Sequence, residues 1–547
     1  MSDTVSTRPE AAVPASGAAA MFTRKTSGLV REYSLTDVTL MNLAGQSLGV
    51  GVALSVFTAA EIWPGANVAI LIVLAAILSL VTAIVYGLMS AAMPRSGGDY
   101  VFVGRTLHPM IGFTANLLIT VSLFIALGLY SDLIVVYGLS NGLSALGLIT
   151  GSHWIATAGA TLSTTKSWIF VWALIFMLVS LYLGFRSAKL VRWSFRVLFV
   201  IGMIGVIAMA IVLLTTSRAD FSHSLARYLG SNDSLAAIHK TAVGAGFKHV
   251  PFSWSQTLKA LPFGFFLFVG VTYTTYIGGE VKRPQRSQPM GMLFAILIGG
   301  ATELILIIGL YAMVGWNNIH AIAYLTVNAP TKLALPTAPL ASFFASIAGS
   351  NTVLAVLIGL GFIAWWLILL LFVVILPSRN LFAYAFDRLM PMALTKVTRN
   401  GAPWVSNLVV GILAIGVIVL TIFTNVVNLI VNYTLMISIT FAVAGIAAAV
   451  FPWRRPDLFE RAPGIVRTRI LGVPLVAIGG VLQAVLFIYI VYESYKTPAF
   501  SGPVGTGAKI FILAVIAAGP VIYYGAQWYR KRENIDIGLM YKELPPD

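Results

Sequence analysis

The chain has 547 residues, of which 58% are hydrophobic and only 10% are charged, and its formal net charge at pH 7 is +16. This composition excludes an ordinary soluble domain, because a soluble fold cannot cover so much apolar surface. The basic residues lie in short clusters between apolar runs, which indicates membrane orientation and argues against a nucleic-acid partner.

Continuous apolar runs predict an all-α membrane protein of about 12 transmembrane helices, since about 20 apolar residues span a bilayer. Strands of a barrel would alternate in polarity, and these runs do not. In chain order, the expected spans are residues 37–60, 64–91, 109–142, 167–185, 193–216, 259–279, 290–315, 350–376, 404–424, 427–451, 470–493 and 507–529.

Charge and composition predict how the expected spans are organised. Most of the 35 Lys and Arg residues fall on the side of the N-terminus, which predicts a multi-pass cell-membrane protein with both termini cytoplasmic. Residues 1–36 have no signal-peptide pattern and are expected to form a mostly disordered cytosolic tail. The expected units are a five-helix repeat at 37–216, an extracellular loop at 217–258, a second, inverted five-helix repeat at 259–451, two extra helices at 452–529 and a cytosolic tail at 530–547.

Glycine interrupts the opening span of each five-helix half, and five is an odd number, so the halves are expected to be inverted. An interrupted helix leaves unpaired N–H groups that attract a carboxylate and carbonyls that attract an ammonium group, so a zwitterionic amino acid fits both ends. The alternative is that these glycines only allow close helix packing. The two stretches are Gly45, Gln46, Ser47, Leu48, Gly49, Val50 and Gly51, and Phe268, Val269, Gly270, Val271 and Thr272.

Two acids lie within apolar runs, where a charge is costly and usually faces a cavity or a partner. Glu303, near the middle of the expected seventh span, is a candidate to carry a proton or to contact a cation. Asp132, in the outer half of the third, is a candidate cavity residue. The alternatives are a protonated Glu303 that is hydrogen-bonded between helices and an Asp132 that lies near the interface.

Three predicted cytoplasmic segments carry a family resemblance. They read MPRSGGDYVFVGR at 93–105, GGEVKRP at 278–284 and PSRNLFAYAFDRLMP at 377–391. In order and spacing the chain resembles the amino acid–polyamine–organocation permeases from about residue 24 to about residue 530. The resemblance implies a LeuT-like fold, in which a five-plus-five inverted repeat is followed by two additional C-terminal helices.

The resemblance also implies a binding mode. The main-chain amides of the first stretch would bind the substrate carboxylate, the carbonyls of the second would bind its amino group, and Phe268 would close over the substrate. Thr272 stands where many members carry an acid. The usual coupling devices are missing as well, since 197–215 contains no ionisable residue and 354–376 contains no Ser or Thr.

The charges of the three segments suggest a cytoplasmic gate. Interfacial anchoring is the first explanation for such charges. An ion-pair network that stabilises one gate state is the added hypothesis, and its members are Asp99, Arg105, Glu280, Lys282 and Asp387. Arg95 is a further candidate gate residue, because its neutralisation should shift the balance between inward and outward states.

The sequence therefore predicts a secondary active amino acid transporter that works by alternating access and is driven by a proton or a counter-substrate. The chain has no cysteine and no P-loop, and its six histidines are scattered, so no enzyme, metal or cofactor chemistry is expected. A carrier or exchanger of polyamines or other organic amines is the alternative substrate class, and a transporter-like membrane sensor is the alternative of another kind. The sequence leaves the particular amino acid and the oligomeric state open.

Overall fold

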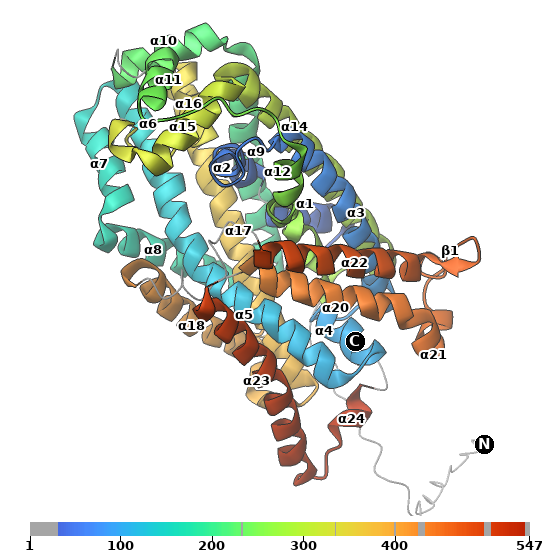
Figure 1. Cartoon of the computed structure of the whole chain (residues 1–547). Helices are drawn as coiled ribbons and strands as arrows, with labels where there is room; N and C mark the ends of the chain where they lie inside the picture. Colours follow the sequence, from blue (N-terminus) through green and yellow to red (C-terminus); the bar gives the residue numbers. More distant parts are fainter. Residues whose placement is uncertain are drawn as a thin grey trace, which may run out of the picture.

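The computed structural model describes residues 31–46, 48–230, 234–333, 335–398, 401–424, 433–496 and 505–541. These residues are almost all helical, and ten of their helices are long and apolar enough to cross a membrane (Figure 1). The prediction of an all-α membrane protein is confirmed.

The ten membrane-length helices occur in the order that the apolar runs predict. They are α3 (Val68–Ala92), the continuous rod of α5 (Pro109–Leu133), π-helical η1 (Ile134–Leu139) and α6 (Ser140–Thr150), α8 (Lys166–Gly184), α9 (Ala188–Thr215), α14 (Pro284–Val314), α17 (Thr352–Phe386), α18 (Trp404–Phe423), α20 (Tyr433–Arg454), α22 (Leu475–Lys496) and α23 (Thr506–Lys531). Residues 427–432, the start of the expected span at 427–451, lie outside the described residues.

The first and sixth expected spans are each built from two shorter helices. The first consists of α1 (Leu35–Gln46) and α2 (Leu48–Ile62), which lie on either side of residue 47, a position outside the described residues. The sixth consists of α13 (Leu261–Phe268), which continues as the 3-10 helix η3 (Val269–Tyr276). The change from α13 to η3 falls within the second glycine-containing stretch.

Shorter elements join and cap the long helices. They are α4 (Asp99–Thr106), α7 (His153–Thr164), α10 (Arg218–Leu229), α11 (Leu235–Gly244), α12 (Trp254–Lys259), η4 (Gly278–Glu280), α15 (Trp316–Asn328), η5 (Pro330–Lys332), α16 (Ala341–Gly349), η6 (Met392–Thr395), α21 (Pro456–Arg461), the hairpin of β1 (Arg469–Ile470) and β2 (Val473–Pro474), and α24 (Ile537–Met540). The expected loop at 217–258 is thus largely helical: α10 packs on α16 and α11 packs on α15, at the end of the molecule away from both termini (Figure 1).

Capping side chains fix where several long helices begin. The side chain of Asn67 accepts a hydrogen bond from the amide of Ile70 at the start of α3, and the side chain of Asn351 does the same for two amides of α17. These bonds satisfy amides that have no partner within the helix. The rod of α5, η1 and α6 ends at Gly151, whose φ of 68° suits glycine.

Small residues set how closely the long helices approach one another. α17 runs through the middle of the bundle and packs against α9, α5 and α18. At its contact with α9, a Cβ atom on Gly205 would lie 2.6 Å from the Cα atom of Gly361, so neither position has room for a side chain. Gly445 of α20 and Gly480 of α22 meet in the same way. Without a hydrophobic drive between helices in lipid, this close packing supplies much of the association energy.

Candidate functional site

The two broken spans touch backbone to backbone at their glycines. A Cβ atom on Gly45 would lie 2.6 Å from the carbonyl oxygen of Gly270, and a Cβ atom on Gly270 would overlap the carbonyl group of Gly45. The side chain of Asn42 adds a hydrogen bond to this crossing, because its oxygen accepts from the amide of Thr274 at 3.3 Å. The crossing therefore needs glycine in both broken spans.

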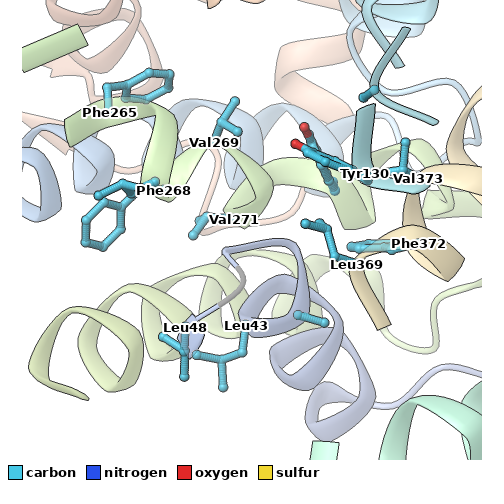
Figure 2. Packing of buried hydrophobic residues seen from close by; sticks show 14 of the residues in the cluster. Leu43, Leu48, Tyr130, Phe265, Phe268, Val269, Val271, Leu369, Phe372 and Val373 are labelled. Atoms are coloured by element: carbon cyan, nitrogen blue, oxygen red, sulfur yellow. The ribbon is translucent and has the colours of Figure 1, made fainter. Parts of the chain in front are cut away.

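A cavity lies beside this crossing, between α1, α2, α5, α13 and α17. Its empty volume, which includes space open to solvent, is about 570 Å³. In Figure 2, Tyr130 of α5 and Leu369 of α17 lie toward one end of the stretch formed by α13 and η3, and Phe265 and Phe268 lie toward the other end. The lining residues are Gly45, Gln46, Gly51, Leu54, Leu129, Tyr130, Leu133, Phe263, Phe266, Leu267, Val269, Trp366 and Leu369.

The cavity is lined mainly by apolar side chains. Leucine, valine and aromatic side chains supply the wall, and none of the described lining residues carries a charge. The lining residues with polar side-chain atoms are Gln46, Tyr130 and Trp366, and the side-chain amide of Gln46 faces Gly299 of α14. The wall of this site suits an apolar body.

Three of the predicted substrate-binding residues, Gly45, Gln46 and Val269, line the cavity. Phe268, the predicted aromatic gate, does not. Its ring edge instead faces Gly300 of α14, where a Cβ atom would lie 3.6 Å away. Phe266, two residues earlier, lines the cavity.

Among the other predicted binding residues, Leu48, Phe268, Gly270 and Thr272 are not among the described lining residues of the cavity. Leu48 and Gly49 form the first turn of α2, and Gly270 contributes the backbone contact with Gly45. The hydroxyl of Thr272 donates to the carbonyl oxygen of Val269 at 3.3 Å, which is a bond within its own helix. Ser47 lies outside the described residues.

The two acids in the spans have different surroundings. Glu303 of α14 is fully buried directly behind Gly51, whose missing Cβ atom would lie 3.0 Å from its Oε1 atom. Asp132 is half-buried on α5, next to the lining residue Leu133, and is not itself among the lining residues.

The proposed gate residues gather at the end of the bundle that carries the first and the last described residues, near Tyr33 and Tyr541, which we call the termini face. There Tyr33 pairs with Val281, and Tyr541 contacts Tyr100 and Arg105. The two buried ion pairs of this face each reach α17 or its end. Arg379 binds Glu280 with N–O distances of 2.9 and 3.3 Å, and Arg105 binds Asp387 at 3.1 Å.

The predicted network is therefore arranged differently from the hypothesis. Glu280 pairs with Arg379, a residue that we did not single out, and the side chain of Lys282 is exposed while its amide donates to the carbonyl of Tyr33. Arg95 donates to the neighbouring carbonyl of Pro94 at 3.1 Å. A further ion pair joins Asp37 of α1 to Arg196 of α9, and the carboxylate of Asp37 also accepts a hydrogen bond from the amide of Ser34 at 2.9 Å.

Asp99 binds hydroxyl and amide groups. The hydroxyls of Tyr276 and Tyr86 donate to its Oδ2 atom at 2.8 and 3.1 Å, and the side-chain amide of Asn116 donates to its Oδ1 atom. Burial raises the pKa of Asp99 to about 6, although the hydrogen bonds from Asn116, Tyr276 and Tyr86 act in the opposite direction. This carboxyl ties α3, α4, α5 and η3 together at the termini face.

Several residues of the site carry only a weak signal in the sequence. Trp366 and Tyr130 are aromatic residues in uniformly apolar runs, where nothing in the pattern separates a cavity position from a core position. Arg379 lies inside the third motif segment, and its position there is the one signal that could have drawn attention to it.

Membrane-length helices, two broken spans that cross at glycines and a cavity beside the crossing define a helical membrane transporter. The model of the amino acid permease family matches residues 35–524, and the chain belongs to that family. It is accordingly an amino acid transporter and not an enzyme, as the sequence predicted.

Similar proteins carry transporter names. The branched-chain amino acid permease BcaP of Bacillus subtilis is 24% identical over 451 residues, which cover 80% of this chain and 84% of that protein. BcaP of Lactococcus lactis is 26% identical over 367 residues, which cover 65% and 70%. The uncharacterized transporter Mb2022c of Mycobacterium bovis is 27% identical over 385 residues, which cover 70% and 72%.

Proposed function

We propose that this permease carries apolar amino acids, with the branched-chain amino acids as the best fit, through the cavity beside the Gly45–Gly270 crossing. The observation that carries the proposal is the lining, an apolar wall of leucine, valine and aromatic side chains without a charged residue among the described lining residues. A branched aliphatic side chain would lie against the wall, and its ammonium and carboxylate groups would lie at the break.

The two charged groups of the substrate are recognised by the main chain in this proposal. The amides around the break, from Gly45, Gln46, Ser47, Leu48 and Gly49, bind the carboxylate, and the carbonyls of Phe268, Val269 and Gly270 bind the ammonium group. The partial charges at helix ends favour this pairing of signs. Thr272 supports the second break through its hydroxyl, which is bonded to Val269.

Transport proceeds by alternating access, with the termini face as the cytoplasmic side of the cell membrane. The clustering of Lys and Arg on that side of the expected spans supports this orientation. The ion pairs Glu280–Arg379 and Arg105–Asp387 keep the termini face closed in the described state, because breaking either leaves a buried charge without its partner. The expected units, two inverted repeats at 37–216 and 259–451 followed by the helices of 452–529, provide the moving parts.

Two further observations favour branched-chain substrates over polyamines. The name of BcaP assigns branched-chain amino acids to that protein in two organisms. A polycation needs facing carboxylates, and none of the described lining residues is an acid.

Counterflow in proteoliposomes tests the proposed substrate class. Proteoliposomes that contain the purified protein are loaded with unlabelled leucine. Uptake of labelled leucine, isoleucine and valine is then compared with uptake of labelled lysine, glutamate and putrescine. We expect counterflow with the three branched-chain amino acids and at least tenfold less with the charged compounds, a difference of about 1.4 kcal/mol or more in binding. Equal or faster counterflow of putrescine would replace the amino acid assignment by the polyamine one.

A pair of tryptophan substitutions on α17 tests the location of the site. Leu369 lines the cavity, whereas Leu360 is 53% exposed on the outside of the same helix. We expect Leu369→Trp to fill the cavity and abolish counterflow, and Leu360→Trp to behave like the wild type. Retention of counterflow in Leu369→Trp would show that the substrate binds elsewhere.

A further inference from the structure

The interface between α14 and the first broken span has a reciprocal polar arrangement. Glu303 of α14 faces Gly51 of α2, and Gln46 of α1 faces Gly299 of α14, one helical turn before Glu303. A Cβ atom on Gly299 would lie 2.6 Å from the Nε2 atom of Gln46, and one on Gly51 would lie 3.0 Å from Oε1 of Glu303. Gly51 therefore makes room for the side chain of Glu303, and Gly299 makes room for the side chain of Gln46.

Both polar side chains are buried without partners among the described residues. Glu303 has no exposed surface, Gln46 is 2% exposed, and no hydrogen bond reaches either carboxyl oxygen or either amide atom in the described part of the chain. A buried polar group normally has its hydrogen bonds satisfied. An ionised carboxylate in such a place would be far more costly than a neutral carboxylic acid.

Other titratable side chains are not bonded to Glu303 in the described residues. The elements packed against α14 are α1, α2, α3, α9, η3, α10 and α15. The titratable residues that they and α14 itself carry are Asp37, Glu61, Tyr86, Lys189, Arg192, Arg196, Arg218, Asp220, His223, Arg227, Tyr228, Tyr273, Tyr276, Arg286, Tyr311, His320 and Tyr324. Among the described residues none forms a hydrogen bond or an ion pair with Glu303, so its charge has no counter-ion there.

The site is next to the substrate cavity. Gly51 and Gln46 both line the cavity. Gly51 also faces Glu303, and Gln46 also faces Gly299. A movement that opens the cavity and separates α2 from α14 would therefore bring water to the carboxyl group. When the interface is closed, as it is here, only the uncharged form fits.

We propose that Glu303 is the proton-binding site that couples this permease to a proton gradient, with Gln46 as its neighbour across the helix interface. The proposal rests on the proposed transport function. With the cavity open to the outside, the carboxylate takes one proton from water, and the neutral acid lets Gly51 of α2 pack against α14. With the cavity open to the termini face, the O–H bond breaks and the proton passes to water inside. One proton thus moves inward with each substrate.

The first test uses the wild-type protein in proteoliposomes that contain a trapped pH indicator. On addition of leucine outside, we expect acidification of the lumen, and an imposed pH difference of one unit, acid outside, should support about tenfold accumulation of leucine. Leucine counterflow without any movement of protons would overturn this inference and leave the transport function standing. Accumulation driven by a sodium gradient alone would overturn it equally.

The second test uses Glu303→Gln, which keeps the shape of the side chain and removes the titration. We expect leucine counterflow to be retained, while accumulation under a pH gradient falls to the equilibrium level and the lumen no longer acidifies. The matched control is Glu61→Gln, which removes an exposed acid at the outer end of α2 and should accumulate leucine like the wild type. Persistent proton-driven accumulation in Glu303→Gln would overturn the inference.

The wild-type measurement keeps the inference testable if Glu303→Gln does not fold. Absence of counterflow for every amino acid in the wild type would instead count against the proposed function.

Discussion

The contact between Gly45 and Gly270 shows how much a single atom decides in this protein. Both positions are glycine in runs that are otherwise rich in larger residues, and the structure places their backbones so close that one methyl group would collide with a carbonyl group. The sequence indicated both glycines, because they interrupt corresponding spans. Only the structure shows that they touch each other.

Adding a methyl group at this crossing should be far more damaging than adding one elsewhere in the membrane. We expect Gly270→Ala to lower stability by about 1–3 kcal/mol through overpacking and to reduce leucine counterflow at least tenfold. The matched control is Gly416→Ala on α18, where the added Cβ atom would meet nothing within 4 Å. Thermal unfolding in detergent and counterflow measure the two effects, and equal behaviour of both variants would argue against a critical crossing.

Asp99 should make stability depend on pH in a definite direction. Burial raises its pKa to about 6 in the folded protein from 3.8, so the folded state holds a proton that the unfolded state has lost between these values. The contribution of Asp99 is therefore fully present below pH 3.8, is lost as the pH rises to about 6, and amounts to about 3 kcal/mol.

Asp99→Asn has no such titration and isolates this contribution. The stability of the wild type relative to Asp99→Asn should therefore fall between pH 4 and pH 7. Unfolding midpoints in detergent across this range measure the difference, and parallel curves for the two proteins would contradict the assignment.

At the scale of elements, the last described residues of the C-terminal segment pack against the termini face. Tyr541, which follows α24, is 3% exposed, and its hydroxyl lies 2.5 Å from that of Tyr100. The guanidinium carbon of Arg105 lies 5.2 Å from the centre of the Tyr541 ring, and the same Arg105 pairs with Asp387. The tail thus contacts α4, which that ion pair joins to the end of α17.

Removal of this ring should loosen the termini face. We expect Tyr541→Ala to lose aromatic and cation–π contacts worth about 1–2 kcal/mol and so to raise the population of the inward-open state by up to about tenfold. The chain has no cysteine, so Leu133→Cys in the cavity supplies a single labelling site. Its labelling rate from the termini face measures the opening.

The control for Tyr541→Ala is Tyr524→Ala, which truncates a ring on α23 that is 51% exposed. This variant should label at the parental rate. An unchanged rate in Tyr541→Ala would mean that the tail is only attached to the face and does not hold it closed.

At the scale of the whole molecule, the orientation in the membrane follows from charge and can be measured directly. Leu471, in the turn of the hairpin, is 99% exposed, and its segment belongs to the termini face because Arg455 donates to the carbonyl of Arg105 at 2.7 Å. Trp154, at the start of α7, is 77% exposed at the other end of the rod.

Single cysteines at these two positions should be labelled from opposite sides. A membrane-impermeant maleimide should react with Trp154→Cys in intact cells and with Leu471→Cys only after the membrane is opened. The reverse pattern would place both termini outside and contradict the positive-inside assignment.

The sequence by itself determined the properties that depend on local composition. The apolar runs predicted the spans, the paired glycines predicted where two spans break, and the three motif segments indicated the family. Each of these is contained in a short stretch of chain, and the bilayer converts apolar length directly into a crossing.

Only the tertiary structure decided which side chains meet. Phe266 rather than Phe268 lines the cavity, Glu280 binds Arg379 rather than Lys282, and Glu303 faces Gly51. The physical reason is that spans apolar on all sides carry no pattern that fixes their rotation about their own axes. That rotation is set by the fit of small residues against large ones between helices far apart in the sequence.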